Sequence, residues 1–188
     1  MLTLSDNLKN CYAAESIKGI ILVIDSGGGE GNASRLITET IAARNKPVVA
    51  FCDDFTCSAA YDIAAAADRV VANAATARIG SIGTYLTIVD FSKQLEKEGI
   101  NLIEIYAEQS KDKNRDYYEA LSGNHAPLKA VVNRYNDAFL ARIRQNRPQA
   151  IATEQEWNTG KLFFADQALS LGLIDAIDSL DNVLNYFS

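Results

Sequence analysis

Residues Asp53 to Thr84 read DDFTCSAAYDIAAAADRVVANAATARIGSIGT, and they contain two serines in contrasting surroundings. Ser58 opens an alanine-rich run, whereas Ser81 lies in the short motif GSIG. The apolar segment that ends at Asp53 and the segment RVVAN at 69–73 both have the composition of a buried strand. The alanine-rich residues between them predict a short helix that begins after Ser58. The stretch therefore predicts strand, helix and strand in succession, which is typical of an α/β fold.

The residues before this stretch continue the same alternation. Leu4, Leu8, Cys11 and Tyr12 recur at helical spacing, and GIILVID at 19–25 predicts a strand that is covered on both faces. NASRLITETIAARNK at 32–46 predicts a helix capped by Asn32, and PVVAFCD at 47–53 predicts a second buried strand. Together these segments predict a βαβ unit. The inward stripe of its helix is expected to comprise Leu36, Ile37, Thr40 and Ile41.

The residues after the stretch predict mainly helices. FSKQLEKEGINLIEIYA at 91–107 predicts a helix ended by Gly99 and then a strand. Residues 127–147 predict a long helix, and Thr153 with Glu156 forms a candidate capping box for another. The expected apolar stripe of the long helix is Val131, Val132, Tyr135, Phe139 and Ile143. Because no repeat or linker divides the chain, we expect one domain over residues 1–188 with a mostly helical C-terminal third.

Composition narrows the class of protein. The chain has 188 residues, a net charge of -6 and no dense lysine or arginine cluster, which argues against a nucleic-acid partner. Its three cysteines, Cys11, Cys52 and Cys57, lack metal-ligand spacing and favour free thiols in a reducing compartment. We expect no membrane segment in this chain and a cytoplasmic location, with association with a phage prohead as an alternative.

A glycine turn and Ser58 both follow predicted strands. DSGGGEG at 25–31 can expose backbone N–H groups to an anion or an oxyanion, although glycines after a strand are often only a tight turn. Ser58 follows the next strand, and open α/β sheets place their sites at the carboxyl ends of strands. The two features are therefore expected to meet at one edge of the sheet.

A serine nucleophile needs a base that takes its proton. His125, the one histidine, lies in the polar segment LSGNHAPLK and favours a solvated loop. Lys111 and Lys113 follow the strand predicted before residue 108, and a lysine that loses its charge on burial can act as a base. Cys57 is an alternative nucleophile, but it points in a different direction from its neighbour Ser58.

Four segments in this order resemble the signal peptide peptidase A (SppA) family of serine proteases and its phage capsid-processing relatives, within the ClpP/crotonase superfamily. They are KGIILVIDSGGG at 18–29, CSAAYDIAAAADRVVA at 57–72, ARIGSIGT at 77–84 and TGKLFFADQALSLGLIDAI at 159–177. The resemblance runs from about Ile17 to the C-terminus. It implies a ClpP/crotonase-like α/β fold of repeated β-β-α units, in which the N-terminal strand of the family has no counterpart in this chain.

The resemblance also implies roles for individual residues. Ser58 aligns with the nucleophile and Lys113 with the general-base lysine, in the element Ser110-Lys111-Asp112-Lys113. Backbone N–H groups of Gly28 and Ala59 would form the oxyanion hole, and Ser81 would help to orient the lysine. The family implies no cofactor and no metal. Its members assemble into rings or domes, so we expect a homo-oligomer in which a neighbouring protomer can supply the lysine.

The chain departs from the family pattern at several of these positions. Gly27 replaces a proline, Ala59 and Ala60 replace two glycines, Asp62 replaces a tyrosine, and the lysine element lacks its glycine. Asp62 lies one helical turn from Ser58, where it would either hold Lys113 protonated or face solvent.

The sequence is consistent with three functions. The first is a serine endopeptidase with a Ser58/Lys113 dyad that acts on peptides or proteins. The second is a catalytically silent homologue that acts as an oligomeric assembly protein. The third is crotonase-type acyl-CoA chemistry, in which similar backbone N–H groups would stabilise a thioester enolate.

Overall fold

The computed structural model describes residues 2–187, with only the backbone of Leu2. The chain forms two compact units. The first, here the sheet unit, comprises the residues up to Gly83 and those from Asp137 onward, and the second, here the insert unit, comprises Thr84–Asn136. The division into two compact units does not decide whether the chain folds as one domain, so the expectation of a single domain stays a prediction.

The sheet unit contains one six-stranded sheet in the described part of the chain. Its strands are β1 (Ile20–Ser26), β2 (Val48–Cys57), β3 (Arg69–Ala72), β4 (Arg78–Gly80), β5 (Leu162–Phe164) and β6 (Ala176–Ile177). The order is β5-β4-β2-β3-β6, with β1 paired to β2. The predicted βαβ unit is confirmed, because β1 and β2 are parallel and are joined by a helix. Only the β4–β5 pair is antiparallel among the pairs described.

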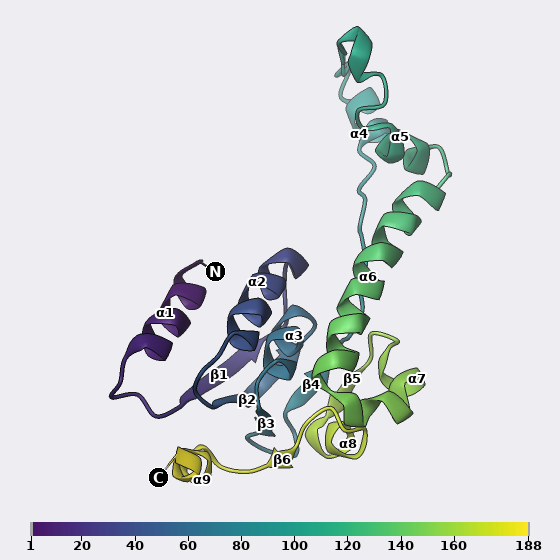
Figure 1. The fold of residues 1–188 in the computed structure, drawn as a ribbon. Helices are drawn as coiled ribbons and strands as arrows, with labels where there is room; N and C mark the ends of the chain where they lie inside the picture. Colours follow the sequence, from purple (N-terminus) through teal and green to yellow (C-terminus); the bar gives the residue numbers. More distant parts are fainter. Residues whose placement is uncertain (1, 188) are drawn as a thin grey trace. The chain divides into compact units, whose positions relative to one another are not determined.

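Helices cover both faces of this sheet. Those of the sheet unit are α1 (Leu2–Ala13), α2 (Gly31–Ala42), α3 (Ala59–Ala65), α7 (Glu154–Trp157), α8 (Ala165–Ser170) and α9 (Leu180–Leu184). Figure 1 shows α1, α2 and α3 on one side of the sheet and α9 on the other. The larger core lies on the first side, where Leu8, Ile41 and Tyr61 pack against alternate residues of β2. Val183 of α9 packs on the opposite face, against Val49 and Phe51.

Two expectations for the first βαβ unit are wrong in detail. The strand β1 is half-buried rather than covered on both faces, since its Val23 side chain is 57% exposed. The cap of α2 is Glu30 and not Asn32, since the Glu30 carboxylate accepts the backbone N–H groups of Asn32 and Ala33 at 2.9 Å. In the expected inward stripe, Leu36 is exposed whereas Ile37, Thr40 and Ile41 are buried.

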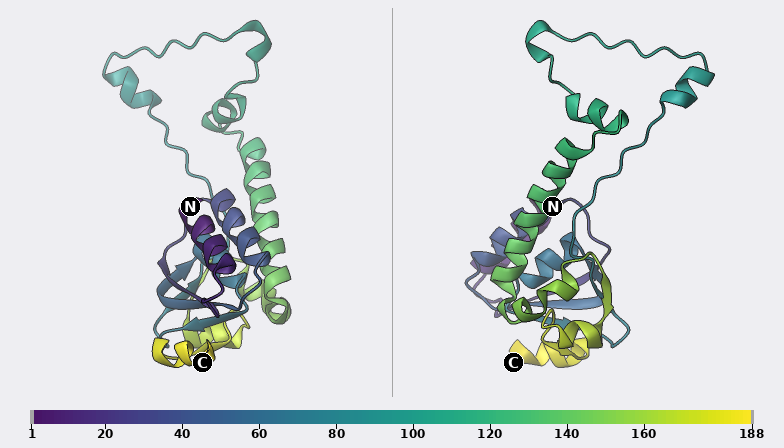
Figure 2. Two further views of the ribbon diagram at one scale, coloured as in Figure 1. Left: turned by 60° about the vertical axis from the view of Figure 1, so that its left-hand side comes forward. Right: turned by 90° about the vertical axis from the view of Figure 1, so that its right-hand side faces the viewer.

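The insert unit is mostly exposed. It contains α4 (Ser92–Lys97), α5 (Arg115–Leu121), the 3-10 helix Glu108–Ser110 and the first half of α6 (Ala126–Asn146). The helix ended by Gly99 is confirmed, but no strand follows it among the described residues, where 100–107 form an irregular segment. Figure 2 shows this segment as coil. Ile103 and Ile105, which a buried strand would cover, are 82% and 92% exposed.

The C-terminal third is mostly helical, as expected. The long helix α6 begins and ends within a residue of the predicted bounds, and Phe139 and Ile143 of its expected stripe are buried. Val131 and Tyr135, which belong to the insert unit, are exposed. The predicted capping box at Thr153 is wrong, because the Thr153 hydroxyl donates to the carbonyls of Ala150 and Leu171.

Tyr61 offers a test of this packing. Its side chain is fully buried, and its hydroxyl donates to the Leu173 carbonyl at 2.7 Å, which ties α3 to the C-terminal segment. Tyr61→Phe is expected to lower the free energy of unfolding by about 1–3 kcal/mol in urea titrations, because the buried carbonyl loses its donor. The control Tyr186→Phe removes an exposed hydroxyl 3.3 Å from Asp178 and should change stability by less than about 0.5 kcal/mol. Equal effects of the two substitutions would contradict this account.

Candidate active site

Ser58 occupies the sharp turn between β2 and α3. Its backbone has φ 52° and ψ −123°, a region that a residue with a side chain rarely adopts and that costs about 1–3 kcal/mol. The Ser58 N–H donates to the Gly80 carbonyl at 2.8 Å, and the Ser58 carbonyl accepts the Asp62 N–H at 3.0 Å. The surrounding structure thus holds a strained serine at the end of a strand and the start of a helix, and its side chain remains partly exposed.

The glycine turn lies against this serine. Gly28 has φ 109°, and a β-carbon placed on it would come within 2.7 Å of the Ser58 Cβ, 2.8 Å of the Cys57 carbonyl oxygen and 3.1 Å of the Ala59 nitrogen. Only a glycine permits so close an approach. The structure therefore brings Gly28, Ser58 and Ala59 together, as the sequence predicted. Whether their N–H groups bind an oxyanion stays a prediction.

The two candidate oxyanion donors differ in their present partners. Ala59 is the first residue of α3, where backbone N–H groups lack acceptors within the helix. The Gly28 N–H donates to the Ser26 hydroxyl at 3.2 Å. To bind an oxyanion, Gly28 would have to exchange that long hydrogen bond for a shorter one to the charged oxygen. Ser26 is thus a residue of the site that the sequence interpretation did not single out.

Ser81 follows the strand next to the serine turn. Cys57 of β2 and Gly80 of β4 are opposite each other in the parallel pair, so Ser58 and Ser81 are the next residues on two neighbouring strands. Ser81 also has a positive φ, 51°, and its N–H donates to the Lys161 carbonyl at 2.6 Å. The predicted proximity of Ser81 to Ser58 agrees with this geometry, and its role in orienting a lysine stays a prediction.

Asp62 is fully buried, so the interpretation that it faces solvent is wrong. The Arg142 guanidinium donates to both carboxylate oxygens at 2.7–3.1 Å, and the Ser34 hydroxyl donates to one of them at 2.7 Å. The carboxylate therefore already has a cationic partner. This weakens the hypothesis that Asp62 holds Lys113 protonated.

Both candidate lysines belong to the insert unit. Lys113 lies between the 3-10 helix Glu108–Ser110 and α5, its N–H donates to the Ser110 carbonyl at 3.0 Å, and its side chain is exposed, as is that of Lys111. Because this unit is described by itself, the pairing of Lys113 with Ser58 stays a prediction.

The other candidates are less suited to catalysis. Cys57 is buried, its Sγ lies 3.5 Å from the Arg78 carbonyl, and burial raises the pKa of its thiol, which disfavours the nucleophilic thiolate. Burial also raises the pKa of Cys52, to about 12. His125 is exposed just before α6. Among residues 2–187, no group of three or more histidine, cysteine or acidic side chains could hold a metal ion.

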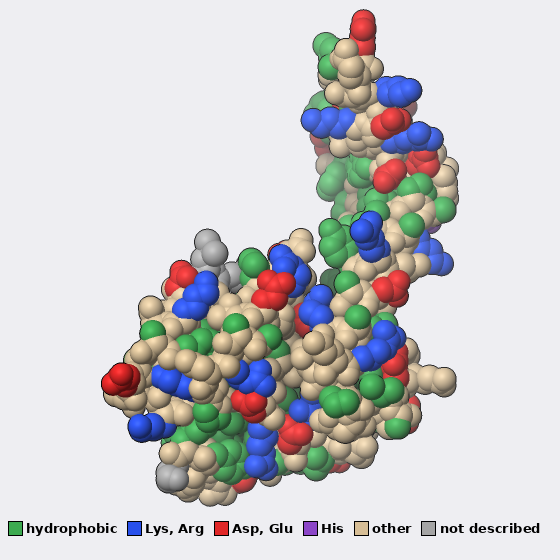
Figure 3. Space-filling view, viewed as in Figure 1, with side chains coloured by type: hydrophobic (Ala, Val, Ile, Leu, Met, Phe, Trp, Pro, Cys, Tyr) green, Lys and Arg blue, Asp and Glu red, His purple; other side chains and the backbone are tan. Residues whose placement is uncertain are grey.

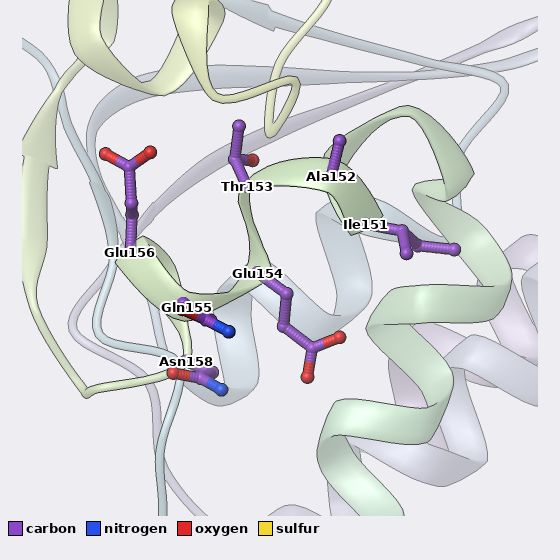
Figure 4. A pocket seen from close by; sticks show the side chains of 7 residues that line it. All are labelled: Ile151, Ala152, Thr153, Glu154, Gln155, Glu156 and Asn158. Atoms are coloured by element: carbon purple, nitrogen blue, oxygen red, sulfur yellow. The ribbon is translucent and has the colours of Figure 1, made fainter.

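A surface hollow of about 620 Å³ lies elsewhere on the sheet unit. Figure 4 shows its lining, which comes from α7 and the segment before it and comprises Ile151, Ala152, Thr153, Glu154, Gln155, Glu156 and Asn158. None of the predicted site residues belongs to this lining.

In the part of the chain that the structure describes, no helix is both long and apolar enough to cross a bilayer.

Residues 40–187 match the sequence profile of peptidase family S49. The chain belongs to peptidase family S49. The match includes Ser58, Ser81 and Lys113, whereas Gly28 lies before it.

Relatives of this S49 chain include a plant and a phage protein. It is 30% identical to the chloroplastic serine protease SPPA of Arabidopsis thaliana, over 96% of this chain and 27% of that protein. It is 35% identical to the head-tail preconnector protein GP5 of Enterobacteria phage P21, over 90% of this chain and 30% of that protein. The chain spans about half or less of the length of the curated relatives it matches.

Solved structures confirm the fold of this S49 chain. A mutant of the membrane-bound stomatin-specific protease 1510-N superposes with a TM-score of 0.63 at 18% identity, over 98% of this chain and 78% of that one. A member of the enoyl-CoA hydratase/isomerase family superposes with a TM-score of 0.55 at 18% identity, over 98% of this chain and 61% of that one. The expected ClpP/crotonase-like α/β fold is therefore confirmed.

Gly28 allows a direct test of the turn. Gly28→Ala is expected to abolish acylation of Ser58 by a serine-directed probe, because the new β-carbon would meet Ser58. It should also lower the free energy of unfolding by about 1–3 kcal/mol, because an alanine is strained at the φ of 109° that this position requires. The matched control is Gly27→Ala, whose β-carbon would meet nothing within 4 Å. Intact-mass measurement and urea titration read out the two effects. Normal acylation of Gly28→Ala would contradict the proposed contact.

Proposed function

We propose that this S49 chain is a serine endopeptidase that cleaves peptides or proteins through Ser58, with Lys113 as the general base. The observation that carries the proposal is the strained turn at Ser58, which lies against Gly28 and precedes the free end of α3. Such a turn presents a hydroxyl beside two backbone donors, which is what acyl transfer requires. The protease names of relatives in the family support the same class of reaction.

The proposed reaction follows the chemistry of an acyl-enzyme. Neutral Lys113 accepts the Ser58 hydroxyl proton while Oγ forms a bond to the substrate carbonyl carbon. The Gly28 and Ala59 N–H groups stabilise the oxyanion that results. When the tetrahedral intermediate collapses, the C–N bond breaks and the leaving amine takes the proton from Lys113. Water, deprotonated by Lys113, then attacks the acyl-enzyme. The bond from the carbonyl carbon to Ser58 Oγ breaks, Oγ takes the proton back from Lys113, and the carboxylic acid leaves.

This mechanism places a condition on Lys113. A lysine accepts a proton only in its neutral form, and removal from water favours that form. Lys113 is exposed within the insert unit, so the active protein must cover it through a further contact. We propose that self-association supplies this contact, in a homo-oligomer whose dyad is completed across protomers.

The surface of the insert unit supports self-association. Many of its apolar side chains are at least half exposed, which is unusual for a protein that remains monomeric. They include Tyr85, Leu86, Val89, Phe91, Ile100, Leu102, Ile103 and Ile105. Figure 3 shows hydrophobic side chains among the charged ones on this part of the surface.

The alternative function is a silent assembly protein with the same fold. The hydrogen bond between Gly28 and Ser26 favours it, since the Gly28 N–H already has an acceptor. The relative named as a phage head-tail preconnector also fits an assembly role. Under this alternative the protein forms stable oligomers and cleaves no peptide. A cytoplasmic or prohead-associated location is part of either proposal.

The dyad predicts a graded response to substitution. Ser58→Ala and Lys113→Ala should each reduce cleavage of a fluorogenic peptide library by at least about a thousandfold, because nucleophile and base act as a unit. Lys111→Ala removes an equally exposed lysine two residues away and should have a mild effect. Substantial cleavage by Ser58→Ala would contradict the proposed nucleophile, and a larger loss in Lys111→Ala than in Lys113→Ala would reassign the base.

Completion of the dyad across protomers predicts complementation. Ser58→Ala retains Lys113, and Lys113→Ala retains Ser58, so mixed oligomers would contain intact dyads at their interfaces. Cleavage should therefore return when the two inactive variants are dissociated, mixed and reassembled. Mixtures of each variant with more of itself are the controls. Persistent inactivity of mixed oligomers, verified by native mass spectrometry, would place both dyad members in one chain.

A further inference from the structure

One buried carboxylate connects two helices of the sheet unit with the second half of α6, which also belongs to that unit. Asp62 lies on α3, Ser34 on α2 and Arg142 on α6. The exposed fraction of the Asp62 side chain is 0%, and that of Arg142 is 23%. We name these three residues the Asp62 cluster. It contains neither Ser58 nor Lys113. The family resemblance implies no role for Ser34 or Arg142.

The cluster connects the first turns of two helices, one that begins shortly after Gly28 and one whose first residue is Ala59. Ser34 is the fourth residue of α2, which begins after the cap Glu30, two residues beyond Gly28. Asp62 is the fourth residue of α3, which begins at Ala59, and its N–H donates to the Ser58 carbonyl. The 2.7 Å hydrogen bond from Ser34 Oγ to Asp62 Oδ2 therefore joins the helix after Gly28 to the helix after Ser58.

Arg142 fixes the position of this carboxylate. Its Nε lies 3.1 and 3.0 Å from the two Asp62 oxygens, and its Nη2 lies 2.7 Å from Oδ2. A planar guanidinium that binds a carboxylate with two donors restricts both distance and orientation. Because an ion pair with a buried member loses much of its Coulomb energy to desolvation, the pair by itself is weak evidence of a stabilising role.

We propose that the Asp62 cluster positions the Gly28 and Ala59 N–H groups at the spacing that an oxyanion requires. Ser34, Asp62 and Arg142 are then positioning residues for the two oxyanion donors, and none of them touches the substrate. The inference rests on the proposed function. Displacement of reacting groups by about 1 Å can cost about a hundredfold in rate, so a loosened cluster should slow acylation without unfolding the protein.

The sheet unit offers a matched control for Arg142. Arg147 also binds a carboxylate with two donors, since its Nη1 and Nη2 lie 2.9 and 2.8 Å from the Asp175 oxygens. Its side chain is 3% exposed. The Asp175 carboxylate accepts the backbone N–H of Val70 in β3 at 2.7 Å, so this ion pair is tied to a strand and not to the helices at the serine turn. Arg142→Lys and Arg147→Lys therefore remove the same fork geometry at two partly buried ion pairs while both keep the positive charge.

A second matched pair tests the link between helices. Ser34→Ala removes the hydroxyl that bonds Asp62 at 2.7 Å and also lies 2.9 Å from the Gly31 carbonyl of its own helix, but it leaves Arg142 in place. Thr38→Ala removes a buried hydroxyl of the same helix that donates only to the Arg35 carbonyl. The two variants lose comparable local bonds, so a difference between them reports on the connection to α3.

The experiment measures acylation of Ser58 by a fluorophosphonate as a function of probe concentration, with urea midpoints for every variant. Arg142→Lys and Ser34→Ala should lower the maximal acylation rate constant about ten- to a hundredfold and leave the half-saturating probe concentration unchanged. Arg147→Lys and Thr38→Ala should shift urea midpoints and leave that rate constant unchanged.

Two outcomes would overturn the inference, and they are distinguishable. If wild type is acylated at Ser58 but Arg142→Lys reacts as fast as Arg147→Lys, the cluster is only structural. If folded wild type is not acylated at all, the proposed function fails and the inference fails with it.

Discussion

The close approach of the Gly28 backbone to the Ser58 turn is the constraint on which the site depends. It exists because β1 and β2 run parallel and end at the same edge of the sheet, where Ser26 pairs with Thr56. Two strand ends can come this close only if one carries no side chain at the contact, and Gly28 meets that condition. The strained conformation of Ser58 is then held by the Gly80 carbonyl on the neighbouring strand.

The sequence predicted the parts of the fold that depend on local pattern. Apolar runs located β1, β2 and β3, and the alanine-rich segment after Ser58 located α3. The shared edge of Gly28 and Ser58 followed from the rule for parallel strands. The cap of α2 was misassigned because Glu30 competes with Asn32 through side-chain geometry, which composition does not reveal. The strand predicted at 100–107 failed because its apolar pattern lacks a pairing partner within the described residues.

The partners of Asp62 could not be predicted from the sequence. An aspartate within an otherwise small and apolar helix indicates a buried partner, because an unpaired buried charge is costly. Its partner Arg142 lies eighty residues away on a helix whose expected stripe was purely apolar, so no local pattern joins the two. The structure gives Asp62 a cationic partner, Arg142, and a hydroxyl partner, Ser34.

Intact mass after incubation with a fluorophosphonate tests the central claim most directly, because it reports the nucleophile and its activation together. The account predicts one adduct per wild-type chain, mapped to the peptide that contains Ser58, and no adduct on Ser58→Ala. An adduct that persists on Ser58→Ala, or a folded wild-type protein that takes up no probe, would contradict it.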